Sequence, residues 1–280
     1  MRKFIVLFSF AVLMLYPNLT YASEYINDLG VVILEEDYNN LKKIYTEKYI
    51  SVLDENEYSR IKNLNLDYDN VQTTVNYVKT EINNVTGEVS ETYITEEEYE
   101  ATQINPQTRA TVYETLYKKT QLTLTQVDSE DAYFSYTALW KMLPSTRSFD
   151  VIGARLSNMS KVNGTQQGKQ IYVLNGVTDY VQYNFNGTNI NNFSNGFGIS
   201  MNLLNSNVTY LECTIDASLE IDAYPATIFT SYQHATSDVT LAQSKSYTIG
   251  AGLGSVFVFS DDNIAEKYDA MQGTYDYFSS

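Results

Sequence analysis

Residues Val208–Ala223 read VTYLECTIDASLEIDA, and apolar and polar side chains alternate along the whole stretch. One parity carries apolar side chains such as Leu211, Ile215 and Leu219, and the other carries mainly polar and acidic ones. This period of two predicts a β-strand with one buried face and one face in water. At about 3.4 Å per residue the strand would span roughly 50 Å, far more than a usual strand. We therefore expect it to bend between two sheets, to contain a bulge, or to stand out as an arm.

Shorter strand patterns surround this stretch on both sides. Residues 132–142 carry apolar side chains at every second position, and residues 256–259 are apolar throughout. Asn-Gly pairs such as Asn175-Gly176 separate neighbouring runs, and this dipeptide favours the type I′ turn of antiparallel hairpins. Many short antiparallel strands indicate a sandwich or a barrel. The predicted fold class is mainly β: an antiparallel β-sandwich with a small helical N-terminal segment and a short C-terminal helix.

The N-terminal part of the chain contains two different segments. Residues 1–22 have the charged start, the apolar run and the small-residue end of a secretory signal peptide. This leader predicts that the protein is secreted to the extracellular space. Residues 23–70 are rich in acids and carry apolar side chains at helical spacing, as in Leu34, Tyr38 and Leu41. They predict an acidic helical hairpin.

The remainder of the chain is predicted to be mostly strands. Residues 71–110 have the pattern of a β-hairpin, followed by a short helix capped at Thr95 and by a linker. Residues 111–280 form the predicted antiparallel sandwich. We expect a helix that starts at Ser260 and extends to Met271 to close this sandwich.

The net charge of the chain is −16, and removal of Arg2 and Lys3 with the signal peptide would bring it to −18. A surface this negative repels nucleic acid and anionic lipid, so the expected partner is a protein or a glycan rather than nucleic acid. The same charge can also serve only to keep an exported protein in solution. The apolar run Phe4–Tyr16 is shorter than the roughly 20 residues of a membrane helix, so no stable span is expected after signal cleavage.

Cys213 is the single cysteine of the chain, so an internal disulfide cannot form and stability must come from the core. It lies on the apolar parity of Val208–Ala223, which predicts a small buried side chain. The single histidine, His234, has no recognisable partner motif in the sequence. A Cys–His catalytic pair therefore has little support.

One group of acidic residues is a candidate metal site. Asp261, Asp262, Asn263 and Glu266 offer oxygen ligands for calcium but lack the spacing and glycine of an EF-hand loop. The alternative is an exposed helix start, where the helix dipole favours acids. The glycine-rich residues 250–255 do not match a dinucleotide or phosphate loop, so we expect no cofactor.

A second group of acids lies on the polar parity of the long strand, at Glu212, Asp216, Glu220 and Asp222. Paired carboxylates suit glycoside hydrolysis, but that reaction needs one acid with a raised pKa inside a cleft. We interpret this acidic row as a solvated strand face that points into water. The sequence predicts no catalytic residues.

Tyrosine is unusually frequent, with 25 residues against 12 phenylalanines and one tryptophan. Tyrosine gives amphipathic contact area at low entropic cost, although it is also a good strand former. The function predicted first is a secreted, acidic, non-enzymatic binding protein that recognises a glycan or a surface partner. A secreted β-pore-forming toxin is one alternative, because membrane strands also alternate over about 9–11 residues. A glycan-active hydrolase is another.

We predict that export cleaves the chain after Ala22, because a charged start, an apolar run and a small residue occur in the required order. N-terminal sequencing of the secreted protein should then begin at Ser23. A first residue far from Ser23, or retention of the whole chain in the membrane, would contradict this prediction.

Overall fold

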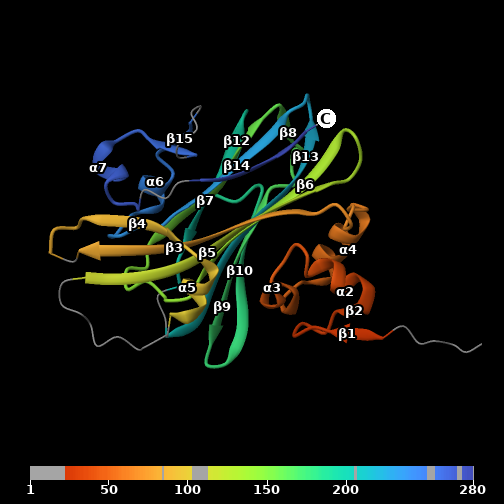
Figure 1. Ribbon diagram of the computed structural model, residues 1–280, viewed down its shortest axis with the longest axis horizontal. Helices are drawn as coiled ribbons and strands as arrows, with labels where there is room; N and C mark the ends of the chain where they lie inside the picture. The colour runs from red at the N-terminus through yellow and green to blue at the C-terminus, as the bar shows by residue number, and fades with distance from the viewer. Residues whose placement is uncertain are drawn as a thin grey trace, which may run out of the picture.

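The computed structural model describes residues 23–83, 85–102, 113–204, 207–250, 256–269 and 273–279 (Figure 1). The fold is mainly β, with two packed antiparallel sheets, short helices at the N-terminal end and a short helix near the C-terminus. The predicted fold class is confirmed. The predicted signal peptide and most of the predicted linker lie outside the described residues.

The larger sheet contains eight strands, here called the large sheet. Its strands are β3 (Gln72–Asn83), β4 (Val89–Ile94), β5 (Tyr113–Gln126), β6 (Asp131–Trp140), β8 (Met159–Lys161), β9 (Gln167–Leu174), β10 (Val177–Asn184) and β13 (Val208–Ile221). The order is β10-β9-β13-β6-β5-β3-β4, and β8 pairs with the end of β13. The β9–β10 turn contains Asn175 and Gly176, both at positive φ, as the Asn-Gly signal predicts.

The second sheet contains five strands and is here called the small sheet. Its strands are β7 (Phe149–Ser157), β11 (Ile190–Phe193), β12 (Gly196–Asn202), β14 (Ala226–Gln233) and β17 (Thr274–Phe278). The order is β11-β12-β7-β14-β17, with every pairing antiparallel. The chain crosses between the two sheets several times, so strands of both sheets alternate along the sequence.

The main core lies between the two sheets. Ile215 of β13 is fully buried there and pairs with Tyr136 of β6 and Gly168 of β9. A Cβ atom on Gly168 would lie 2.8 Å from the Ile199 side chain and 2.7 Å from that of Met201, both on β12. Glycine at this position leaves room for these two side chains of the opposite sheet, and a larger residue would force them to move.

The long strand predicted from the sequence is β13, and it lies in the middle of the large sheet. It pairs with β6 on one side and with β9 on the other. The register with β9 shifts between Val208 and Tyr210, so the strand contains the irregularity that was one of three expectations. The expectation of a free arm is wrong in this structure.

The polar parity of β13 does not face water along its central part. Glu212 and Asp216 have exposed fractions of 0% and 1%, because the N-terminal helices lie over this side of the large sheet (Figure 1). Glu220 and Asp222, near the end of the strand, are exposed. The interpretation of the acidic row as solvated is therefore wrong for Glu212 and Asp216.

Residues 23–70 form a small unit, here called the N-terminal lobe. It contains β1 (Glu24–Ile26), β2 (Val32–Leu34), α2 (Glu35–Leu41), α3 (Glu47–Ser51) and α4 (Glu55–Asn63). A two-stranded ribbon and three short helices thus replace the predicted helical hairpin, since Leu34 ends a strand instead of lying inside a helix. Asp54 caps α4, and its carboxylate accepts the Glu57 backbone N–H at 2.9 Å. No helix among the described residues is both long and apolar enough to cross a membrane.

Residues 71–110 do contain the predicted hairpin, formed by β3 and β4. The short helix that follows is α5 (Glu96–Ala101), and Thr95 and Glu98 form its capping box as expected. β3 pairs with β5 along its whole length. The hairpin is therefore an edge of the large sheet and not a separate unit.

The C-terminal residues build a second small unit on the outer face of the small sheet, here called the C-terminal lobe. It contains α6 (Leu241–Ser244), β15 (Tyr247–Ile249), β16 (Phe257–Phe259) and α7 (Asp262–Ala265). The predicted closing helix is shorter than expected: it ends at Ala265, and Asp261 rather than Ser260 caps it. Tyr268 lies beyond the end of this helix, although it is four residues after Ile264 as in a helical pattern. Both side chains are apolar because both pack in the core of this lobe. The last strand, β17, then returns to the small sheet.

We predict that Ile215→Asp abolishes cooperative unfolding or prevents secretion, because it would place an unpaired charge in the core between the sheets. Burial of such a charge costs several kcal/mol, a large part of total stability. Urea denaturation of the purified protein measures the effect. Val177→Asp, at a residue 66% exposed on edge strand β10, is the matched control and should unfold like the unmodified protein. A stable Ile215→Asp monomer would contradict the assignment of β13 to the core.

Candidate functional site

Asp261, Asp262, Asn263 and Glu266, the candidate calcium ligands, lie at α7. The Asp261 carboxylate accepts hydrogen bonds from the backbone N–H of Asn263 at 2.9 Å and from its side-chain amide at 2.8 Å. Asp261 therefore acts as the N-cap of the helix, as in the alternative interpretation of these residues. Among the described residues, no three His, Cys, Asp or Glu side chains are grouped so that they could hold a metal ion.

A buried set of charged side chains, here called the helix–sheet network, joins the N-terminal lobe to the large sheet. Lys169 of β9 forms an ion pair with Glu57 of α4, and both side chains are nearly inaccessible. Arg60 of α4 donates to Asp216 of β13 at 3.0 Å. The Tyr49 hydroxyl donates to Glu57. Each of the two carboxylates thus has a cation from the other side of the interface.

Burial raises the pKa values of several acidic groups in and beside this network. It raises the pKa of Glu57, while Lys169 acts in the opposite direction. Burial also raises the pKa of Glu212, which accepts hydrogen bonds from the hydroxyls of Thr46 at 2.7 Å and Thr214 at 3.2 Å. The pKa of Tyr49 is raised well above its usual value, so its phenol stays a hydrogen-bond donor. Most of these polar groups have a partner within the network, whereas the buried Nε of Arg60 has no hydrogen-bond partner among the described residues. The contacts hold the lobe on the sheet.

A second buried set, here called the core network, lies between the two sheets. The ammonium group of Lys118, on β5, has no exposed area and pairs with Glu91 at 2.9 Å and with Asp269. The other carboxylate oxygen of Asp269 accepts the backbone N–H of His234 at 2.7 Å. Burial raises the pKa of Asp269 to about 7; Lys118 opposes this rise, and the charge on Glu91 adds to it. Two carboxylates therefore share one cation, which favours a proton on Asp269.

The side chain of His234 lies beside the core network and has a partner, Asp150, that the sequence did not reveal. Its Nδ1 lies 3.0 Å from both carboxylate oxygens of Asp150, which also accepts the Tyr232 hydroxyl. An imidazole held by a carboxylate occurs at sites of general base catalysis. Here both side chains have zero exposed area, and the imidazole packs against the edge of Trp140. A substrate could not reach this imidazole without separation of the sheets.

Cys213 is fully buried in the core between the sheets, as its parity predicts. Burial raises the pKa of its thiol well above the usual value, and the charges of Asp150 and Glu212 act in the same direction. A thiol that stays protonated is a poor nucleophile. Cys213 therefore serves as a small apolar side chain of the core.

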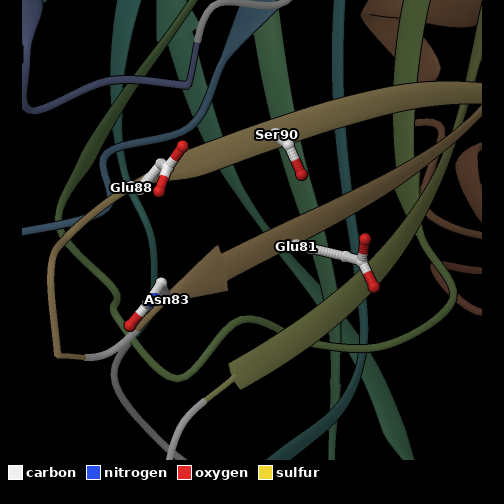
Figure 2. Close-up of a pocket in the computed structure, with 4 residues that line it drawn as sticks. All are labelled: Glu81, Asn83, Glu88 and Ser90. Carbon is white, nitrogen blue, oxygen red and sulfur yellow. The ribbon is translucent and has the colours of Figure 1, made fainter.

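A shallow hollow lies at the tip of the β3–β4 hairpin, with a volume of about 370 Å³. Figure 2 shows that Glu81 and Asn83 from β3, and Glu88 and Ser90 from the β4 side, line it. Glu81 already pairs with Lys79 at 2.9 Å, and the Asn83 side chain accepts two backbone N–H groups of its own turn. Asn83 thus shapes the turn of the hairpin, and Glu81 is paired within its own strand.

The outer side of the small sheet carries an exposed aromatic surface at its edge, here called the tyrosine face. Tyr275 and Tyr277, on the same side of β17, are 60% and 51% exposed. In the next strand Phe229 pairs with Tyr275, with ring centroids 5.8 Å apart, and Thr227 pairs with Tyr277. The sequence showed many tyrosines, but only the pairing of β17 with β14 brings these side chains together.

Comparison of this chain with protein-family models, curated proteins and solved structures finds no match. Its function must therefore be argued from the arrangement of its own residues.

The raised pKa of Asp269 predicts how stability depends on pH. The carboxyl titrates near 4 in an unfolded chain and at about 7 in the folded protein, so folding favours its protonated form. Its contribution to stability is complete below about pH 4 and is lost as the pH rises through about 7. We expect the free energy of unfolding to fall by on the order of a few kcal/mol between about pH 5 and 8. Glu57 and Glu212 act in the same direction, because burial raises both of their pKa values.

Denaturant titrations across this pH range measure the effect, and two variants locate it. Asp269→Asn cannot titrate, so its unfolding free energy should change less with pH. Asp262→Asn alters an exposed carboxyl of α7 and should keep the slope of the unmodified protein. Equal slopes in all three proteins would show that Asp269 does not carry the pH dependence.

Proposed function

We propose that this chain is a secreted, non-enzymatic binding protein that recognises an uncharged glycan through the tyrosine face. The observation that carries the proposal is the exposure of Tyr275 and Tyr277 on one side of edge strand β17. Secretion is supported by the leader-like residues 1–22.

The chemistry of the tyrosine face suits a sugar. A pyranose ring has an apolar C–H side that stacks on an aromatic ring, and hydroxyls at its rim that need polar partners. The phenol of a tyrosine supplies both parts, and its ring loses little entropy on binding. The Phe229 ring lies beside Tyr275, with the Arg155 guanidinium 3.9 Å from its centroid, and Thr227 pairs with Tyr277 on the neighbouring strand.

The strand beneath this face is held in place by its other side. Phe278 is buried in the core between the sheets. The Asn76 side chain of β3 donates to the Thr274 hydroxyl at 2.6 Å, and the Thr74 hydroxyl donates to Asp276 at 3.3 Å. These contacts tie β17 to both sheets, so the exposed tyrosines project from a fixed strand. A preorganised surface loses less entropy when it binds.

The charge of the protein favours an uncharged ligand. The net charge of −16 disfavours polyanions such as nucleic acids and sulfated glycans, because repulsion lowers their local concentration. A neutral glycan carries no such penalty. The net charge thus supports an uncharged ligand, and the exposure of the two tyrosines supports the tyrosine face as its binding site.

A glycan array followed by a titration of the best neutral glycan tests the proposal. We predict that Tyr275→Ala with Tyr277→Ala weakens binding by roughly 10- to 100-fold, because each stacked ring contributes about 1 kcal/mol or more. The unfolding midpoint should change little, since both side chains are more than half exposed.

Tyr93→Ala is the matched control, because Tyr93 is an exposed tyrosine on β4 of the other sheet. It should bind glycan like the unmodified protein. Absence of any bound glycan, or equal losses in the control and in the double variant, would overturn the proposal.

A further inference from the structure

The ribbon formed by β1 and β2 carries a second exposed surface, which is aliphatic. Ile26, Val32 and Leu34 are 64%, 48% and 40% exposed, and Ile26 lies directly opposite Val32. Leu29, in the turn between the strands, is 47% exposed. We call these four side chains the ribbon face. Single exposed apolar residues are common, but a contiguous group of this kind marks an interaction site.

The opposite side of the ribbon already has its own core contacts. Ile33 has no exposed area, and Tyr25 stacks on Tyr38 of α2 with ring centroids 4.3 Å apart. A ribbon with one buried side needs only polar residues on the other side to be stable in water. The aliphatic side chains of the ribbon face are therefore not required by the packing of the N-terminal lobe.

Asn27 fixes the ribbon to the rest of the lobe. Its side-chain amide donates to the carbonyls of Ile50 at 3.1 Å and Leu53 at 2.7 Å. Its side-chain oxygen accepts the backbone N–H groups of Leu29 at 3.0 Å and Val31 at 2.9 Å. Because Asn27 is itself buried, these four bonds hold the turn rigidly. The ribbon face is thus a preformed surface.

The surroundings of the ribbon face are acidic. Glu24, Asp28, Glu35 and Glu36 are all exposed next to it in the chain. The sequence has no lysine or arginine between Ser23 and Leu41. An aliphatic centre with a negative rim is complementary to an apolar surface with a positive rim.

We propose that the ribbon face binds a basic amphipathic segment of another protein, with aliphatic side chains over Ile26 and Val32 and cations toward Glu35 and Glu36. A second copy of this chain would bring two negative rims together. An anionic membrane would meet the same repulsion. The inference is independent of the tyrosine face, which lies on the small sheet.

A titration with a synthetic helical peptide, with leucines on one face and lysines around them, tests this surface on the secreted protein. Ile26→Thr with Val32→Thr keeps the β-branched shape needed in a strand but removes apolar contact area. We expect this variant to bind the peptide at least about tenfold more weakly. Glu35→Gln with Glu36→Gln should weaken binding less and should flatten its dependence on salt, because screened charges are removed.

Val177→Thr makes the same kind of change at an exposed valine of β10 and should leave peptide binding unaltered. Circular dichroism and thermal unfolding confirm that each variant is folded. A peptide with glutamates in place of the lysines should not bind. The proposal is overturned if the Ile26 and Val32 variant binds like the unmodified protein. It is also overturned if the ribbon face instead mediates self-association on a sizing column, or if the protein binds phosphatidylcholine–phosphatidylglycerol vesicles and not the basic peptide.

Discussion

The burial of the polar side of β13 is the constraint on which the rest of the structure depends. Glu212 and Asp216 are inaccessible to water, and an ionised carboxylate in a dry interior is destabilised by several kcal/mol unless it is paired. Arg60 supplies a cation for Asp216, and the hydroxyls of Thr46 and Thr214 supply donors for Glu212. Arg60 and Thr46 belong to the N-terminal lobe. The lobe therefore both buries these acids and supplies their partners, and its removal would also expose the apolar side chains of Tyr133 and Ile171, which share its core.

The same arrangement fixes the register of the large sheet. A shift of β13 by one residue would turn Glu212 and Asp216 into the core between the sheets and Ile215 toward Arg60. Both changes are unfavourable, since one buries unpaired acids and the other leaves a cation without a partner. We infer that the helix–sheet network contributes to specificity as well as to attachment. Buried polar groups have this role in some proteins, where they exclude alternative registers.

Several local patterns in the sequence predicted local structure correctly, although the lengths of the helices were not among them. The period of two identified β13, Asn175-Gly176 identified a turn, and Thr95 with Glu98 identified a helix start. The burial of one strand face by a part of the chain that is distant in the sequence could not be predicted in this way. Alternation shows that two sides of a strand differ in polarity, but it does not show whether a further layer covers the polar side. The pairing of His234 with Asp150, 84 residues apart, likewise depends on the pairing of β7 with β14, which no short motif encodes.

The arrangement of layers also separates the two proposed binding surfaces. The N-terminal lobe lies on the outer side of the large sheet (Figure 1). The tyrosine face lies on the outer side of the small sheet, with the core between the two. A ligand on one surface therefore does not block the other. The charged groups that could couple the two sides, such as Lys118 and Asp269, are paired inside the core and reach neither surface. Binding at the two surfaces should accordingly be additive, since a ligand changes affinity elsewhere only when it alters a shared structural element.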